Sequence, residues 1–189
     1  DHTKIIFLCS PNNPTGNSLI KEEVEVVLNN YFGLAVIDEA YINFSRHRSF
    51  VQLLNDYPNL VVLQTLSKAW GLAALRLGMA YASEEIINVL NKVKPPYNIN
   101  QASQELALQA LEEVGQVNDM IREIVEQRAK LASQLQDLPL VLRIYPSDAN
   151  FLLVKVTDAK SIYNFLLTKG IVVRDRSRVE LCEGCLRIT

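Results

Sequence analysis

A lysine that could act as a nucleophilic amine lies just after an apolar run of the sequence. Ser67-Lys68-Ala69 follows residues 60–63, whose Leu-Val-Val-Leu sequence indicates a buried strand. Burial disfavours an ammonium ion and lowers the pKa of a lysine, so that the amine can attack a carbonyl near neutral pH. We therefore expect Lys68 to be buried beside this strand and to form a Schiff base.

Phosphate-binding side chains flank this lysine. Ser67 offers a hydroxyl, and Arg76 offers a planar fork of N–H donors that suits phosphate oxygens. Thr65 would add a third donor. Each has a simpler interpretation, because Ser67 could cap a helix and Arg76 could form a surface salt bridge.

Polar side chains also follow the two preceding strand candidates. Asp38 ends the apolar run 34–37, Tyr41 comes shortly after it, and Asn13 lies in the turn Asn-Asn-Pro-Thr-Gly. Ligands of open α/β sheets collect at the carboxyl ends of strands. There a carboxylate can pair with a protonated pyridine nitrogen, and an amide can donate to a phenolate oxygen.

Taken together, these groups are the ones that a pyridoxal phosphate site requires. Taken singly, Asp38 could cap a helix or pair with Arg76, and Asn13 could belong to an ordinary Asn-Pro turn. The combination of Asp38, Tyr41 and Lys68 favours a functional site.

Two arginines near the end of the sequence could form an anion site. Arg174 and Arg187 each lie beside an apolar run that indicates a strand. If the two strands are neighbours, the guanidinium groups converge. Spacing alone supports surface charge at strand ends equally well.

The cysteines and histidines do not form a metal motif. Cys182 and Cys185 make a CxxC, but a structural zinc site needs more ligands, and His2, His47 and Cys9 lie in distant segments. We interpret the CxxC as two ordinary loop thiols. The low cysteine count favours a reducing cytoplasm.

The composition indicates a soluble globular protein. The chain has 189 residues, a length that is enough for one large domain or two small ones. Of these residues, 49% are hydrophobic and 21% are charged. The formal net charge of −2 comes without a basic block, so nucleic acid is not an expected partner. No apolar stretch approaches the length of a membrane span, and no signal peptide is present.

The pattern of strands and helices predicts an α/β fold with a largely parallel sheet. In the first half we expect strands at 4–9, 34–37, 60–64 and 77–82, with helices at 19–31, 50–55 and 84–91. In the second half we expect a helical stretch over 100–136 with a break near Gly115, strands at 141–145, 151–156, 171–174 and around Leu186, and a helix at 159–169. A boundary at the Pro-Pro pair divides the chain into 1–95, part of a large domain, and 96–189, a linking helix and a smaller α/β domain.

The motifs resemble those of fold-type I pyridoxal-phosphate aminotransferases, and most closely the histidinol-phosphate aminotransferase family. The match is collinear over nearly the whole chain, and the contexts of Arg174 and Arg187 favour histidinol phosphate within the superfamily. The matching segments are 11–16, 38–41, 65–69, 71–72, 75–78, 146–151, 173–175 and 184–189.

The resemblance implies a role for each candidate residue. Lys68 would carry the cofactor covalently and move a proton between the substrate Cα and the cofactor. Asp38 would pair with the pyridine nitrogen, and Asn13 and Tyr41 would contact the ring hydroxyl oxygen. The cofactor phosphate would bind Ser67 and Arg76. Arg187 would bind the glutamate carboxylate, and Arg174 with Arg187 would hold the substrate phosphate.

The resemblance also implies that this sequence is a fragment. The first third of the family pattern is absent, with its further phosphate-binding amides, ring-stacking aromatic residue and N-terminal arm, and so are the last few residues. Both ends of the sequence look like cuts through strands. The piece alone is expected to be inactive, and the intact protein is expected to be a cytoplasmic homodimer whose partner subunit completes each site.

The leading function is transamination between histidinol phosphate and 2-oxoglutarate in histidine biosynthesis. Two rivals share the fold, namely a threonine-phosphate decarboxylase and a broad-specificity aminotransferase. A different class of protein, a non-catalytic module on the same fold, would tolerate loss of Lys68 or Asp38, and both are present.

Overall fold

The first sheet of the molecule is built from the N-terminal half of the chain. The computed structural model describes residues 2–189. The sheet has the order β1 (Ile5–Cys9), β2 (Leu34–Asp38), β3 (Leu60–Thr65) and β4 (Gly78–Ala82). The first three strands are parallel and β4 is antiparallel to β3. The expectation of a mainly parallel sheet is therefore confirmed, and the carboxyl ends of β1, β2 and β3 share one edge.

One face of this sheet carries a hydrophobic core. Helix α1 (Lys21–Asn30) places Val24 and Leu28 on the same side, because residues four apart in a helix share a face. They pack on alternate residues of β2 and β3, together with the 3-10 helix η2 (Phe50–Leu53). Leu60, 0% exposed, belongs to this core, and its replacement by alanine would cost about 2–5 kcal/mol.

Three helices connect the two halves of the molecule. They are α2 (Glu84–Val93), α3 (Gln101–Glu112) and α4 (Val114–Gln136). Asn100 caps α3, since its side chain accepts a hydrogen bond from the Ser103 N–H at 2.8 Å. The expected break near Gly115 lies instead at Glu113, which is common to the end of α3 and the start of α4.

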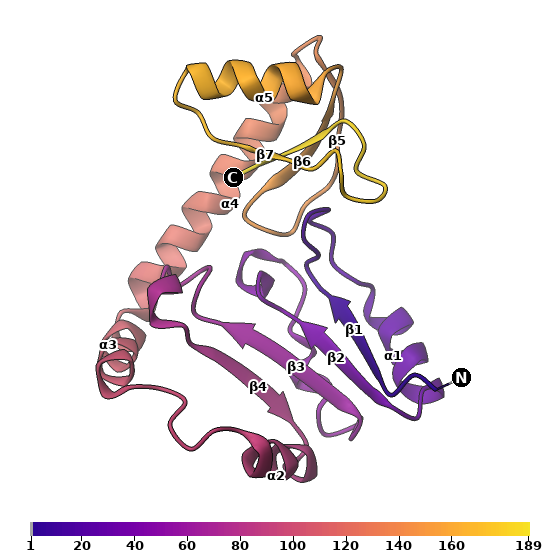
Figure 1. The fold of residues 1–189 in the computed structure, drawn as a ribbon, viewed down its shortest axis with the longest axis vertical. Coiled ribbons are helices and arrows are strands. Elements are labelled where there is room, and N and C mark those ends of the chain that lie inside the picture. Colours follow the sequence, from indigo (N-terminus) through magenta and orange to yellow (C-terminus); the bar gives the residue numbers. More distant parts are fainter. Residues whose placement is uncertain (1) are drawn as a thin grey trace.

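The second sheet is antiparallel throughout. It has the order β5 (Val141–Ile144), β6 (Leu152–Val156), β8 (Cys185–Ile188) and β7 (Arg174–Asp175). Helices α4 and α5 (Ala159–Thr168) cover one face. Figure 1 shows α4 running from the first sheet up to the second, with α5 at the far end. The division at residues 95 and 96 stays a prediction.

The expected strand at 171–174 is mostly wrong. Gly170, at φ +74°, and Ile171 donate backbone hydrogen bonds to Leu167 and Leu166 of α5, which is a Schellman ending for the helix. The chain is therefore still bound to the helix at Ile171, and strand pairing begins only at Arg174. The expected helix at 19–31 likewise begins later, at Lys21.

A small core joins the two halves. Tyr41, Phe44 and Ala69 from the first half pack with Ala149 and Phe151 from the second. Nearby, the Asp148 N–H donates to the Gly16 carbonyl at 2.7 Å. Gly16, at φ +81°, lies so close to Ser147 that a side chain would collide with it. The loops that follow β1 and precede β6 therefore meet at close range. Within residues 2–189, no helix combines the length and apolarity that a membrane crossing requires.

Candidate active site

The parallel strands bring the predicted site residues to one edge of the first sheet. Asp38 is the last residue of β2 and pairs in register with Cys9 of β1 and Leu63 of β3. Asn13 lies in the loop after β1, and Lys68 lies in the turn after β3. The sequence patterns that were separate along the chain thus converge at the carboxyl ends of neighbouring strands, where α/β proteins bind ligands.

Lys68 is exposed, so the expectation of a buried lysine is wrong. In the turn after β3 the neighbours Leu66 and Ala69 point into the protein, and Lys68 is left on the outer side. Its Nζ lies 5.3 Å from the centroid of the Tyr41 ring, a cation–π distance. The aromatic ring, rather than burial, is therefore what positions this amine.

An aromatic bridge connects Lys68 to the second sheet. The Tyr41 and Phe151 rings meet edge to face, with centroids 5.2 Å apart and planes at 88°. On the other side of the bridge, Arg187 Cζ lies 5.0 Å from the Phe151 centroid. Arg187 Nη1 also donates a hydrogen bond to Asn13 Oδ1 at 2.9 Å. The two halves of the molecule therefore contribute to one continuous cluster.

The two candidate anion-binding arginines are neighbours. Arg174 of β7 and Arg187 of β8 are directly opposite each other in the antiparallel ladder. Like charges in such a position destabilise a sheet unless an anion compensates them. Burial lowers the pKa of the Arg187 guanidinium, and the positive charges of Arg176 and Arg174 lower it further, while Tyr41 acts in the opposite direction.

Asp38 keeps most of its hydrogen-bonding capacity. Its Oδ1 accepts from the Ala40 N–H at 2.9 Å, a local turn contact. No ion pair between Asp38 and Arg76 occurs within the part of the chain that the structure describes. Arg76 is exposed, has a left-handed backbone with φ 54°, and donates to the Ala73 carbonyl at 3.2 Å.

The hydroxyl groups beside Lys68 differ in availability. Thr65 Oγ1 donates to the Leu77 carbonyl at 3.2 Å and accepts from the Ser67 N–H at 3.1 Å. Its hydroxyl is thus used to shape the turn. The Ser67 hydroxyl has no hydrogen-bond partner among residues 2–189. Of the two, Ser67 is better placed to donate to a ligand, and both assignments stay predictions.

Three residues that sequence reasoning did not single out belong to this region. Glu39, 1% exposed, accepts hydrogen bonds from Ser49 Oγ, the Phe50 N–H and Gln64 Nε2 at 2.6, 2.6 and 2.8 Å, and so anchors the strand end that carries Asp38. Phe151 forms the aromatic bridge, and Arg176 approaches Arg187. No local pattern identifies them, because their partners are distant in sequence.

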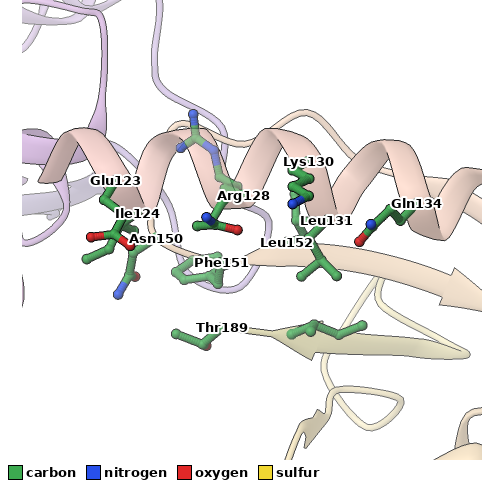
Figure 2. Close-up of a pocket in the computed structure, with 12 residues that line it drawn as sticks. Glu123, Ile124, Arg128, Lys130, Leu131, Gln134, Asn150, Phe151, Leu152 and Thr189 are labelled. Carbon is green, nitrogen blue, oxygen red and sulfur yellow. The ribbon is translucent and has the colours of Figure 1, made fainter. Parts of the chain in front are cut away.

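A pocket of about 530 Å³ lies elsewhere, between α4 and the ends of β6 and β8. Figure 2 shows Glu123, Arg128 and Gln134 on the helix above Phe151, Leu152 and Thr189. Among the cluster residues, only Phe151 reaches it, and Lys68, Asp38 and Asn13 do not. The cluster at the strand ends, not this pocket, gathers the groups that can do chemistry.

The cysteines are free thiols in the described chain. Cys182 and Cys185 are buried, so the interpretation of both as ordinary loop thiols misses their place in a small core with Leu153. Burial raises the pKa of both thiols. Within residues 2–189, no group of at least three His, Cys, Asp or Glu side chains is arranged to hold a metal ion.

Known proteins resemble this chain over its whole length. The family profile described as "Aminotransferase class I and II" matches residues 1–189. A curated histidinol-phosphate aminotransferase from Cytophaga hutchinsonii is 56% identical over 188 residues, which cover 100% of this chain and 54% of the relative. The chain therefore spans about half the length of the curated relatives it matches.

Solved structures share the fold. Histidinol-phosphate aminotransferase from Sinorhizobium meliloti, in complex with pyridoxal-5'-phosphate, matches with a TM-score of 0.87 and 25% identity, covering 98% of this chain and 52% of that one. L-threonine-O-3-phosphate decarboxylase from Porphyromonas gingivalis matches with a TM-score of 0.86 and 26% identity, covering 98% and 59%.

Proposed function

The chain belongs to the class I and II aminotransferase family, and from that premise we propose that the intact protein transaminates histidinol phosphate. The amino group passes reversibly to 2-oxoglutarate, giving imidazole-acetol phosphate and glutamate. In histidine biosynthesis the same reaction runs in the opposite direction, with imidazole-acetol phosphate as the amino acceptor. The observation that carries the proposal is the cross-strand pair of Arg174 and Arg187, which the aromatic bridge connects to Lys68. The name of the Cytophaga relative supports the same substrate.

The donor set at the strand ends fits pyridoxal phosphate. A carboxylate at the end of β2 suits a protonated ring nitrogen, and the exposed amine of Lys68 suits the aldehyde carbon. The Ser67 hydroxyl and the Arg76 guanidinium are donors for a phosphate. Asn13 accepts from Arg187 through Oδ1, which leaves its Nδ2 hydrogens for a ring oxygen, together with the Tyr41 hydroxyl. Bound there, the cofactor would supply the electron sink for the amino-bearing carbon.

Separate residues of this chain would transfer the proton and stabilise the charge. Lys68 Nζ would accept the proton from the substrate Cα and then donate it to the cofactor. With the cofactor bound, Asp38 would stabilise the positive charge of its ring nitrogen. The aromatic contact with Tyr41 would hold the lysine amine at the strand ends, where the cofactor is proposed to bind.

The arginines select and orient the two substrates. Arg187, held between Asn13 and the Phe151 ring, binds the carboxylate of glutamate. Histidinol phosphate has no carboxylate, and its phosphate takes the place between Arg187 and Arg174. One site thereby accepts two amino donors whose anionic groups differ in charge and size.

We further infer that the intact protein is a cytoplasmic homodimer, with small-molecule substrates and neither nucleic acid nor membrane as a partner. Large apolar side chains on α2 and α3 support an interface, since Val93 is 73% and Leu108 65% exposed. The free thiols in the described chain suit a reducing compartment.

Product analysis of the full-length enzyme tests the proposed reaction. With histidinol phosphate and 2-oxoglutarate, we expect imidazole-acetol phosphate and glutamate in equal amounts. When 2-oxoglutarate is omitted, we expect no glutamate and at most one equivalent of imidazole-acetol phosphate per site. The structural likeness to a threonine-phosphate decarboxylase makes that reaction the second candidate. Release of CO₂ from phosphothreonine, without glutamate formation from histidinol phosphate, would replace our proposal with decarboxylation.

A further inference from the structure

A third arginine lies beside the pair in the second sheet. Arg176 directly follows β7, and its backbone N–H donates to the Cys185 carbonyl at 2.9 Å, so the β7–β8 pairing continues past Asp175. Alternate residues of an extended strand share a face. Arg176 therefore lies on the same face as Arg174, and Arg174 is opposite Arg187.

Two buried N–H donors of this cluster lack acceptors, although Arg187 Nη1 donates to Asn13 Oδ1 at 2.9 Å. The Nε atoms of Arg176 and Arg187 are buried and have no hydrogen-bond acceptor in the described chain. None of the three arginines forms an ion pair within residues 2–189. The adjacent acidic side chain, Asp175, is occupied by the Ser177 N–H and Ser177 Oγ at 2.9 and 2.6 Å. The protein has thus gathered positive charge and buried donors without supplying an anion.

We propose that Arg176 is a specificity residue that binds the doubly charged phosphate of the substrate together with Arg174 and Arg187. The inference rests on the proposed function. A phosphate monoester carries more negative charge than a carboxylate and offers three oxygens rather than two. A third guanidinium therefore benefits the phosphorylated substrate more than glutamate. The effect of Arg176 on the pKa of Arg187 agrees with this proximity.

The test compares Arg176→Gln with Arg178→Gln in the full-length holoenzyme. Arg178 is exposed, lies on the same loop and loses the same charge, which makes it the matched control. For Arg176→Gln we expect the KM for histidinol phosphate to rise at least about tenfold, with the KM for glutamate within about twofold and kcat little changed. Arg176→Lys, which keeps the charge, should recover part of the loss. Arg178→Gln should match the wild type.

Equal losses for both substrates would show a merely structural role and overturn the inference, as would an unchanged KM for histidinol phosphate. If Arg176→Gln does not fold, the same comparison is made with Arg176→Lys, whose point charge lacks the Nε donor.

Inhibition of the glutamate half-reaction by inorganic phosphate distinguishes failure of this inference from failure of the proposed function. If the wild type ignores histidinol phosphate, the proposed function fails. Weaker phosphate inhibition in the Arg176 variant would still support an anion site there, and unchanged inhibition would overturn it.

Discussion

At the scale of single residues, the environment of Lys68 differs from that of a buried nucleophile. The side chain is exposed and lies against the Tyr41 ring. If Lys68 reacts with a carbonyl compound as proposed, desolvation by the described chain alone does not explain that reactivity. The position of the amine is set by one turn and one aromatic contact.

Chemical labelling tests the role of Lys68. Borohydride reduction of the intact holoenzyme should fix a pyridoxyl group on Lys68, because that amine lies in the turn after β3, against the Tyr41 ring. Peptide mass spectrometry locates the label. Lys92→Ala, which removes an exposed lysine of α2, should leave the label and the holoenzyme absorbance unchanged. A label on any lysine other than Lys68 would refute the assignment.

Substitution of the two paired arginines separates their roles. Arg174→Ala should impair histidinol phosphate much more than glutamate, whereas Arg187→Ala should impair both. Loss of a charge-assisted contact to a buried anion costs about 2–5 kcal/mol. Arg187 also contacts Asn13 and Phe151, so its removal would also disturb Asn13, a residue proposed to bind the cofactor. Steady-state kcat/KM for each substrate measures the effect. Equal impairment by Arg174→Ala would remove its phosphate-specific role.

At the scale of elements, Glu39 holds the carboxyl end of β2 against its neighbours. The buried carboxylate accepts hydrogen bonds from Ser49, Phe50 and Gln64. Ser49 is the N-cap of η2, Phe50 is its first residue, and Gln64 belongs to β3. Glu39→Ala would leave the buried Phe50 N–H without an acceptor and would remove the carboxylate that Ser49 Oγ and Gln64 Nε2 donate to, although Gln64 Nε2 keeps its contact with Ser49 Oγ at 3.2 Å. We expect a loss of about 2–4 kcal/mol in the free energy of unfolding of the intact protein, measured in urea.

The control for this substitution is Glu126→Ala, an exposed position inside α4, which should change stability by no more than about 0.5 kcal/mol. If Glu39→Ala proved as stable as Glu126→Ala, Glu39 would not be the anchor that its hydrogen bonds indicate.

The N-cap of α5 makes a pH-dependent contribution to the stability of the folded state. Hydrogen bonds from the Ser161 N–H and then the Ser161 hydroxyl lower the pKa of Asp158. Because the folded-state pKa is below the unfolded one, the contribution is full above the unfolded pKa and is lost as pH falls through the folded pKa. Asp158→Ala should lower the melting temperature at neutral pH, and the gap to wild type should narrow in acid. Asp158→Asn, which retains an acceptor but does not titrate, is the control. A gap that does not depend on pH would contradict this account.

At the scale of the whole molecule, two sheets share one site through the core of Tyr41, Phe44, Ala69, Ala149 and Phe151. Neither half alone contains the cluster, because Lys68 and Asn13 come from the first and Arg187 from the second. Movement of one sheet against the other would change the distance between the amine and the anion site. The proposed site therefore depends on how this core holds the two sheets together.

The purified 189-residue chain should not turn over histidinol phosphate and 2-oxoglutarate at a detectable rate. It spans 54% of its curated relative, and catalytic groups act as a unit. Phe7 on the edge strand β1 is 68% exposed, which favours self-association. Absorbance titration should show weak uptake of pyridoxal phosphate, with the full-length enzyme as the control. Robust turnover by the shorter chain would show that its residues suffice for the reaction.

The sequence by itself determined the fold class, the parallel strands and the residues at their carboxyl ends. Apolar runs, turn residues and polar side chains after strands are local signals, and Asn13, Asp38 and Lys68 follow from them. The resemblance of the motifs to one aminotransferase family reached the same conclusion. Whether Arg174 and Arg187 met each other was left open.

Only the tertiary structure decided how distant segments meet. The pairing of Arg174 with Arg187 depends on the register of β7 and β8, and the approach of Arg176 depends on its continuation. The exposure of Lys68 and the end of α5 beyond Gly170 depend on which backbone groups find partners in a turn or a helix cap. These features could not be predicted from local patterns, because burial and charge are properties of surroundings that non-neighbouring residues create.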